Sequence, residues 1–345
     1  MRRTQIVALL SVVALAVPAQ ASTRGQLTHG SYSAPGGLTR TYLEYVPARL
    51  APHSPVVVFL HGCNETAAQA MQATHLNALA DTQGFTVVYP EQVVAAGSSA
   101  PLADGNGIGC WNWFLPAHQA RGAGEPAVLA GLAQQVTSDV KGDPKRVYVE
   151  GISAGADMSV ILGATYPDVF AAAASLAGCA YSACADAGGS LTHDAMGPRA
   201  RIVPLFVENG TADVLNPVAQ SEGLVQSWLG ADDLADDGQS NQSISRNAAS
   251  QTTTMPSGTP SPGAGDACVH NNSFTCLGGV AGLSDYPVTV QTWNDSKGKD
   301  VLELWTVHGL AHAHPNAPGD GPYTDPLGPD VSAASYHFFV QHHLP

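Results

Sequence analysis

Residues 146–165 place a strand, a glycine-flanked serine and a helix in immediate succession. The run RVYVE at 146–150 predicts a strand, GISAG follows at 151–155, and the apolar spacing of 154–165 predicts a helix. A serine on such a sharp turn is held in a strained conformation with its hydroxyl exposed, and flanking glycines avoid clashes. The GxSxG pattern alone is weak, but in this context it makes Ser153 the candidate nucleophile.

The rest of the chain alternates strand and helix patterns. Strands are predicted at 41–46, 56–60, 85–89, 204–207, 288–293 and 301–307, and helices at 127–140 and 331–344. The 56–60 run, VVVFL, is apolar throughout, as in a strand buried on both faces. Together these patterns predict an α/β fold with a mostly parallel central sheet and helices on both faces.

One polar stretch interrupts this alternation. Residues 232–282 are rich in Ser, Thr, Asn, Gly and Pro and poor in large apolar residues. They predict an insertion in a single catalytic domain over residues 22–345, forming either a surface loop or a lid.

A nucleophilic serine needs a base, and the base needs a carboxylate that orients it. In this architecture the carboxylate and then the histidine follow the serine, each beyond a strand end. Asp213 follows the strand 204–207 through the turn residues 209–211 and is the candidate carboxylate. The competing acids lie in the polar stretch, where we expect them to be solvated: Asp232, Asp233, Asp236 and Asp237.

Three histidines follow the strand 301–307 in the sequence HGLAHAH. His308 is flush with the strand end and suits a packed or capping side chain. His312 lies further out, where it could reach back to Ser153, and His314 could line the cleft. Position favours His312 without excluding the other two. A metal site that also uses His337, His342 and His343 is a weaker alternative, because no acidic residue is spaced with them and no CxxC…CxxC or HExxH motif occurs.

The oxyanion of an acyl-transfer reaction is bound by backbone N–H groups. One should be that of Ala154, directly after the candidate nucleophile. The other should come from the loop after the strand 56–60, where Gly62 permits a close approach and Cys63 offers the N–H. An ordinary strand-ending turn is the alternative for this loop.

Further on, CWNWF at 110–114 places Trp111 and Trp113 two residues apart, so one could face a cleft and the other the core.

The N-terminus predicts export. Arg2 and Arg3 precede a short apolar run at 6–17, and small residues at 19–21 suit cleavage before Ser22. The run is too short for a membrane anchor, so residues 1–21 are interpreted as a signal peptide and the protein as secreted or periplasmic.

The cysteines fit an exported protein, where disulfides persist. The chain contains six: Cys63, Cys110, Cys179, Cys184, Cys268 and Cys276. Fifteen pairings are possible. The short spacings favour Cys179–Cys184 and Cys268–Cys276 as local loops, which leaves Cys63–Cys110 as a long-range disulfide.

The charge balance argues against several partners. The 345 residues include 14 Lys and Arg against 28 Asp and Glu, a net charge of −14. A nucleic-acid binder needs a basic face, and an anionic substrate or membrane surface would be repelled. No segment after the N-terminus has about 18 uninterrupted apolar residues, the length that a membrane span requires. We therefore expect no nucleic-acid or membrane partner, and a monomer.

Six segments in order resemble a known family. They are LHGC at 60–63, CWNWF at 110–114, RVYVEGISAG at 146–155, ATYPDVFAA at 164–172, NGTAD at 209–213 and GLAHAHP at 309–315. Together they resemble the extracellular polyhydroxybutyrate depolymerase-like esterases, which are related to the feruloyl and acetylxylan esterases of carbohydrate esterase family 1.

The resemblance implies an α/β-hydrolase fold that needs no cofactor or metal. It also implies a triad of Ser153, Asp213 and His312, with the Cys63 and Ala154 N–H groups as oxyanion donors. The implied substrate is a short-chain hydroxyalkanoate polyester or oligoester, with an esterified plant cell-wall polysaccharide as the alternative and a non-catalytic secreted binding protein as a distant one.

Two departures from the family pattern concern the substrate. Members commonly carry Trp two residues after the catalytic histidine, as a wall for the acid part of the substrate, whereas this chain has His314. Trp111, Trp113 and His314 are therefore the candidate substrate contacts, with core packing as the equal alternative for either Trp. Polymer-degrading members usually append a linker and a polymer-binding module; with neither in this sequence, we expect amorphous polymer or soluble oligomers to be preferred over crystalline granules.

Overall fold

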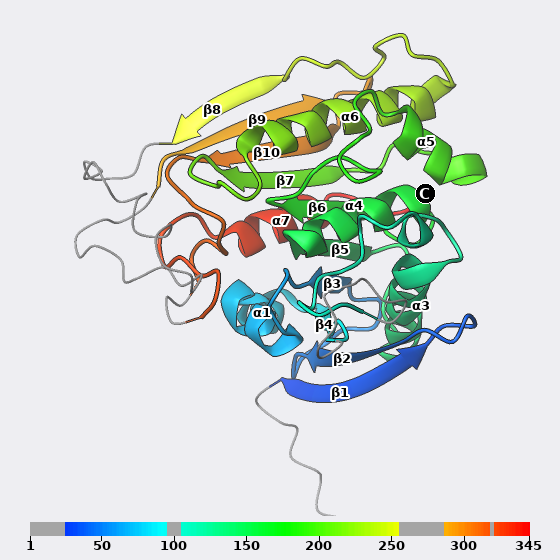
Figure 1. The fold of residues 1–345 in the computed structure, drawn as a ribbon, viewed down its shortest axis with the longest axis vertical. Helices are drawn as coiled ribbons and strands as arrows, with labels where there is room; N and C mark the ends of the chain where they lie inside the picture. The colour runs from blue at the N-terminus through cyan, green and yellow to red at the C-terminus, as the bar shows by residue number, and fades with distance from the viewer. Residues whose placement is uncertain (1–24, 95–104, 255–285, 318–320) are drawn as a thin grey trace, which may run out of the picture.

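A computed structural model describes residues 25–94, 105–254, 286–317 and 321–345. Its strands form one sheet in the order β1-β2-β4-β3-β5-β6-β7-β10-β9-β8 (Figure 1). The strands are β1 (Gln26–Ser33), β2 (Thr39–Val46), β3 (Val56–Leu60), β4 (Thr86–Pro90), β5 (Val147–Ile152), β6 (Ala172–Leu176), β7 (Leu205–Gly210), β8 (Ser250–Thr254), β9 (Val288–Asn294) and β10 (Asp300–Val307).

The middle of the sheet is parallel. The six strands from β4 to β10 in the sheet order pair in parallel with one another, whereas β1 and β2 on one side and β9 and β8 on the other pair antiparallel. The predicted α/β class with a mostly parallel sheet is confirmed. Parallel strands bring their carboxyl ends to one edge, which is where ligands bind in open α/β sheets.

Helices cover both faces of the sheet. They are α1 (Ala67–Thr74), α2 (Leu76–Gln83), α3 (Gly124–Asp139), α4 (Ala154–Thr165), α5 (Ser190–Met196), α6 (Val218–Asp237) and α7 (Val331–Phe339), with 3-10 turns η1 (Pro116–His118) and η2 (Gly197–Arg199). One buried cluster joins the sheet to residues of α3, α4 and α6, and a second joins it to residues of α1, α2 and α7.

The strand β3 shows why its sequence is apolar throughout. Val56, Val58 and Leu60 belong to the first cluster, whereas Val57 and Phe59 belong to the second. Successive side chains of a strand point to opposite faces, so a strand covered on both sides needs an apolar residue at every position. All five residues are buried.

The prediction of a polar insertion starting at residue 232 is wrong over its first part. Residues 232–237 are the last turns of α6, and residues 250–254 form the exposed edge strand β8. Asp232 and Asp233 are buried rather than solvated. Asp232 accepts a hydrogen bond from the Val203 N–H, and Asp233 accepts one from the N–H of Gln242. The remaining residues, 255–282, lie outside the described part of the chain.

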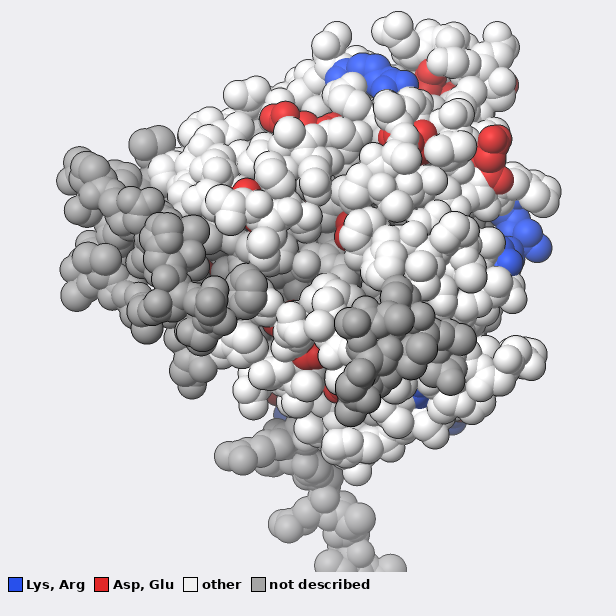
Figure 2. All heavy atoms as spheres, viewed as in Figure 1, with Lys and Arg blue, Asp and Glu red and all other residues white. Residues whose placement is uncertain are grey.

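The visible surface is weakly charged. Uncharged side chains dominate the face shown in Figure 2, and its Lys and Arg side chains stand in small separate groups. Within the described residues, no helix is both long and apolar enough to cross a membrane. The predicted signal peptide, residues 1–21, lies outside the described residues.

Candidate active site

Ser153 lies on a strained turn between β5 and α4, as predicted. Its φ is 57° and its ψ is −125°, a conformation that a residue with a side chain rarely adopts. A Cβ atom at Gly151 would lie 2.6 Å from the Leu60 carbonyl oxygen, and one at Gly155 only 2.1 Å from the same atom. The two flanking glycines are therefore required by the backbone of β3 passing beside the turn.

Asp213 and His312 meet beyond the ends of the neighbouring strands β7 and β10. The Asp213 Oδ2 lies 2.7 Å from the His312 Nδ1, and both side chains are largely buried. The Asp213 Oδ1 accepts hydrogen bonds of 2.8 Å from the N–H groups of Leu215 and Asn216. The carboxylate is thus held on one side by backbone and faces the imidazole on the other.

The other two candidate histidines lie elsewhere. His308 pairs with the Thr289 hydroxyl on the exposed side of β9, at 2.8 Å. His314 is buried and its Nε2 lies 3.1 Å from the Glu65 Oε1. Of the three, His312 is the one that contacts Asp213.

A pocket of about 190 Å³ is lined by two of the three predicted triad residues, Ser153 and His312. It is lined by Gly62, Cys63, Asn64, Glu65, Ile152, Ser153, Leu215, His312 and Tyr323. Ser153 and His312 therefore share one cavity. The Tyr323 ring packs edge-on against the His312 ring, with 5.9 Å between their centroids, and forms one wall.

The predicted oxyanion loop borders the same pocket. A Cβ atom at Gly62 would lie 3.4 Å from the Ser153 Cβ, so a glycine here keeps the loop close to the serine. Cys63 lines the pocket, and Ala154 begins α4 directly after Ser153. The geometry brings both predicted donor residues to the serine.

Two disulfides agree with the predicted pairing: Cys63–Cys110 and Cys179–Cys184. Cys63–Cys110 ties the predicted oxyanion loop, residues 61–63 after β3, to the aromatic segment 110–114. The third predicted pair, Cys268–Cys276, lies outside the described residues.

The predicted substrate contacts need correction. Trp111 has no exposed surface, and its indole N–H donates to the His61 carbonyl oxygen at 3.0 Å, so it belongs to the core. His314 is 2% exposed and is turned toward Glu65, so it cannot form an open wall of the cleft. Trp113 is half-buried against the ring of Phe114 and is not among the residues that line the pocket.

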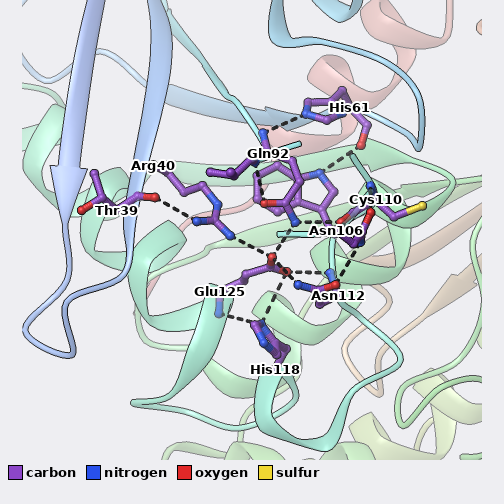
Figure 3. A network of polar contacts seen from close by, with 11 residues as sticks. Thr39, Arg40, His61, Gln92, Asn106, Cys110, Asn112, His118 and Glu125 are labelled. Atoms are coloured by element: carbon purple, nitrogen blue, oxygen red, sulfur yellow. Dashed lines mark hydrogen bonds and ion pairs between the residues drawn. The ribbon is translucent and has the colours of Figure 1, made fainter. Parts of the chain in front are cut away.

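A buried polar network connects the aromatic segment to His61, the residue before Gly62 (Figure 3). Glu125 lies at its centre, 2.9 Å from the Arg40 guanidinium, and accepts a 2.7 Å hydrogen bond from the Asn112 N–H. Gln92 donates to the Cys110 carbonyl oxygen. This network could not be predicted from the sequence, because its members come from distant parts of the chain and carry no motif.

The metal alternative gains no support from the described histidines. Both ring nitrogens of His342 contact backbone carbonyl oxygens, those of Phe338 and Asp300. Among the described residues, no group of three or more His, Cys, Asp or Glu side chains is arranged to hold a metal ion.

The fold and this junction of strand, strained serine and helix define the class of protein: an α/β-hydrolase. Residues 40–227 match the family model described as esterase PHB depolymerase, and the chain belongs to that family.

Curated relatives include a depolymerase, a feruloyl esterase and an acetylxylan esterase. The chain is 31% identical to poly(3-hydroxyalkanoate) depolymerase C of Paucimonas lemoignei over 83% of this chain and 61% of the relative. It is 35% identical to feruloyl esterase B of Neurospora crassa over 41% of this chain and 45% of the relative. It is also 35% identical to a probable acetylxylan esterase A of Aspergillus flavus over 39% of this chain and 40% of the relative. The chain thus spans between two fifths and about three fifths of these relatives.

The fold also matches a solved structure. The acetyl xylan esterase from Aspergillus awamori aligns with a TM-score of 0.60 at 18% identity, over 92% of this chain and 100% of that one. At this identity the match supports the α/β-hydrolase fold alone.

Proposed function

We propose that this protein is a secreted carboxylic ester hydrolase that uses Ser153 as nucleophile, His312 as general base and Asp213 as the orienting carboxylate. The observation that carries the proposal is the 2.7 Å contact between Asp213 and His312 beside the pocket that His312 shares with Ser153. Its setting in a chain of the esterase PHB depolymerase family supports the same chemistry.

The reaction proceeds through an acyl-enzyme. The Ser153 Oγ attacks the ester carbonyl carbon while His312 takes the hydroxyl proton. The Cys63 and Ala154 N–H groups bind the oxyanion of the tetrahedral intermediate. His312 then protonates the leaving alcohol, and it next removes a proton from the water that attacks the acyl-enzyme. The bond between the acyl carbon and the Ser153 Oγ breaks, His312 returns the proton to that oxygen, and the carboxylic acid leaves. Asp213 stabilises the imidazolium throughout. This chemistry calls for no cofactor.

The favoured substrate is a short-chain 3-hydroxyalkanoate polyester or oligoester. The named activity of the Paucimonas lemoignei relative supports this class. The pocket of about 190 Å³ lies below the roughly 300–1,000 Å³ typical of sites for drug-sized ligands and suits a small acyl group. The second candidate is an esterified plant cell-wall polysaccharide, because a feruloyl esterase and a probable acetylxylan esterase are also among the similar proteins. An acetyl group would also fit this pocket.

The proposed setting is outside the cytoplasm, with residues 22–345 as a single monomeric catalytic domain. Two disulfides support export, because such bonds persist in oxidising compartments. The sequence pattern of residues 1–21 agrees with this.

Product analysis tests the proposal. The mature protein and its Ser153→Ala variant are given amorphous polyhydroxybutyrate and, separately, feruloylated and acetylated xylan. We expect 3-hydroxybutyrate monomers or dimers from the wild type and none above background from the variant. Release of ferulate or acetate alone would identify an esterified cell-wall polysaccharide, instead of the polyester, as the substrate. Equal release by the variant and the wild type would overturn the role of Ser153, and no release by either would favour the binding protein.

A further inference from the structure

A buried carboxylate and a buried histidine connect the two loops of the proposed active site. Glu65 lies on the loop after β3, three residues beyond Gly62, and His314 lies two residues beyond His312. The Glu65 Oε1 and the His314 Nε2 are 3.1 Å apart, and the side chains are 1% and 3% exposed. The two residues are 249 positions apart in the chain, so this contact joins segments that no local structure holds together.

The second oxygen of Glu65 acts on the oxyanion loop itself. Its Oε2 accepts a 2.7 Å hydrogen bond from the Gly62 N–H. Gly62 immediately precedes the proposed donor Cys63, and a Cβ at Gly62 would lie 2.9 Å from this same oxygen. The carboxylate therefore fixes the backbone directly before Cys63, which lines the pocket.

His314 extends the connection to the other side of the pocket. The backbone N–H of His314 donates to the Tyr323 carbonyl oxygen at 2.6 Å, and the His314 carbonyl oxygen accepts from the backbone N–H of Asp325 at 3.0 Å. The Tyr323 ring in turn packs against the His312 ring. A single path of contacts thus runs from the oxyanion loop through Glu65 and His314 to the neighbourhood of the proposed base.

The surroundings favour a charged carboxylate at Glu65. Burial by itself would raise its pKa, but the charge and hydrogen bond of His314 and the Gly62 N–H outweigh burial and hold the pKa below its usual value. A buried carboxylate needs such partners, and removing one of them leaves a costly unpaired group.

We propose that Glu65 and His314 form a clamp that positions the oxyanion loop relative to His312, so that both are positioning residues for the proposed hydrolysis. The clamp also explains why His314 occupies a place where we had expected a substrate contact: its ring is used inside the protein. This inference rests on the proposed function.

The test compares kcat per active site for a set of variants, using hydrolysis of a short-chain p-nitrophenyl ester. A fluorophosphonate that labels the nucleophile counts the folded active sites. We expect Glu65→Ala and His314→Leu each to lower kcat per labelled site by about tenfold to a hundredfold, because a small misplacement of catalytic groups has effects on this order. KM should change less than threefold, and the double variant should be no slower than the slower single variant, because both changes break one clamp.

Matched variants separate positioning from stability. Glu65→Gln keeps an oxygen for the Gly62 N–H and should retain at least a third of the wild-type kcat. Asp233→Ala removes another buried carboxylate that accepts backbone hydrogen bonds, from Gln242 and Ile244, and should leave kcat per labelled site unchanged. If Glu65→Ala does not fold, Glu65→Asp replaces it, because the shorter side chain cannot reach both partners; we expect at least a tenfold loss.

The outcomes distinguish the clamp from the proposed function. In one outcome the wild type is active while the Glu65 variant (Glu65→Ala or Glu65→Asp) and His314→Leu both keep the wild-type kcat per labelled site. That result would overturn the clamp but not the proposed function. Independent, multiplicative effects of the two single changes would also overturn it. A wild type that is neither labelled nor active would overturn the proposed function, and the clamp's catalytic role with it.

Discussion

At the scale of single residues, Asp213 is the most sharply defined member of the proposed triad. Both of its oxygens have partners, two backbone N–H groups on one and His312 on the other. In Asp213→Asn the new amide would donate toward the imidazole and favour the wrong tautomer. We expect kcat to fall by about 10³–10⁴.

Steady-state hydrolysis of a p-nitrophenyl ester measures this effect. Asp233→Asn is the matched control, because it changes a buried aspartate of α6 that was a competing candidate. A loss of less than tenfold in Asp213→Asn, or an equal loss in both variants, would remove Asp213 from the triad.

Some residues of the candidate site could be predicted from the sequence and others could not, for physical reasons. Ser153 follows from local order alone, because a strand, a turn and a helix meet there. The choice of His312 among three histidines needed the family resemblance, since loop direction is not encoded locally. Glu65 was missed because its partner lies 249 residues away, and nothing in the local sequence marks that contact.

At the scale of elements, the close approach of α4 to β3 determines which helix glycines can be replaced by alanine. A Cβ at Gly155 would lie 2.1 Å from the Leu60 carbonyl oxygen, whereas a Cβ at Gly223 on α6 would meet nothing within 4 Å. We expect Gly155→Ala to prevent folding or to destabilise strongly. Gly223→Ala should stabilise by about 0.5–1 kcal/mol, because alanine is the better helix former. Urea unfolding followed by circular dichroism compares the two; similar effects would contradict this packing.

Helix α4 also carries a carboxyl group that makes stability depend on pH. Burial raises the pKa of Asp157 to about 8, although the Cys179 N–H donates to it and acts in the opposite direction. The unfolded chain ionises this group near its ordinary value of 3.8. The folded protein therefore holds a proton that the unfolded chain releases, and the free energy of unfolding falls as pH rises from about 4 to 8.

Asp157→Asn tests this, because the amide mimics the protonated acid and can still accept from Cys179. We expect the free energy of unfolding of the variant to increase relative to that of the wild type as pH rises from about 4 to 8. The increase should reach up to about 1.4 kcal/mol per pH unit. Urea unfolding at pH 5, 6, 7 and 8 measures the difference. Asp233→Asn should differ from the wild type by an amount that stays constant over this range, because hydrogen bonds outweigh burial and lower the pKa of Asp233, which is therefore ionised in both the folded and the unfolded chain. A pH-independent difference for Asp157→Asn would contradict the buried proton.

The success of the fold prediction also varied by element. β3 and α4 match their predicted ranges, because both have clear apolar patterns between turn residues. β6, Ala172–Leu176, was missed because four of its residues are Ala and Ser, which are weak strand formers. α7 ends at Phe339 rather than at residue 344. The end of α6 was mistaken for a loop because its Asp residues look solvated in sequence, whereas Asp232 and Asp233 accept buried backbone hydrogen bonds.

At the scale of the whole molecule, the two disulfides should contribute unequally to stability. Cys63–Cys110 closes a separation of 47 residues, and Cys179–Cys184 closes one of 5. Loop-closure entropy predicts losses of about 4 and about 2 kcal/mol when each pair is replaced by serines. Urea midpoints of the two double-serine variants test this order. A larger loss for Cys179–Cys184 would show that local contacts, rather than chain entropy, dominate.

The sheet as a whole explains how residues from distant parts of the chain form one site. Ser153, Asp213 and His312 follow β5, β7 and β10, which belong to the parallel part of the sheet and end at the same edge. Loops vary more readily than the strands that they connect, so we expect the loops beyond this edge to decide substrate choice.

Intact-protein mass spectrometry tests the central claim, that Ser153 is the nucleophile of an ester hydrolase, most directly. The mature protein is incubated with diethyl p-nitrophenyl phosphate, and both the adduct and the residual esterase activity are followed in time. We predict one diethylphosphoryl group per chain, located on Ser153 by peptide mapping, forming at the rate at which activity disappears and absent from Ser153→Ala. Full esterase activity in Ser153→Ala, or an adduct on another residue that tracks the loss of activity, would contradict the account.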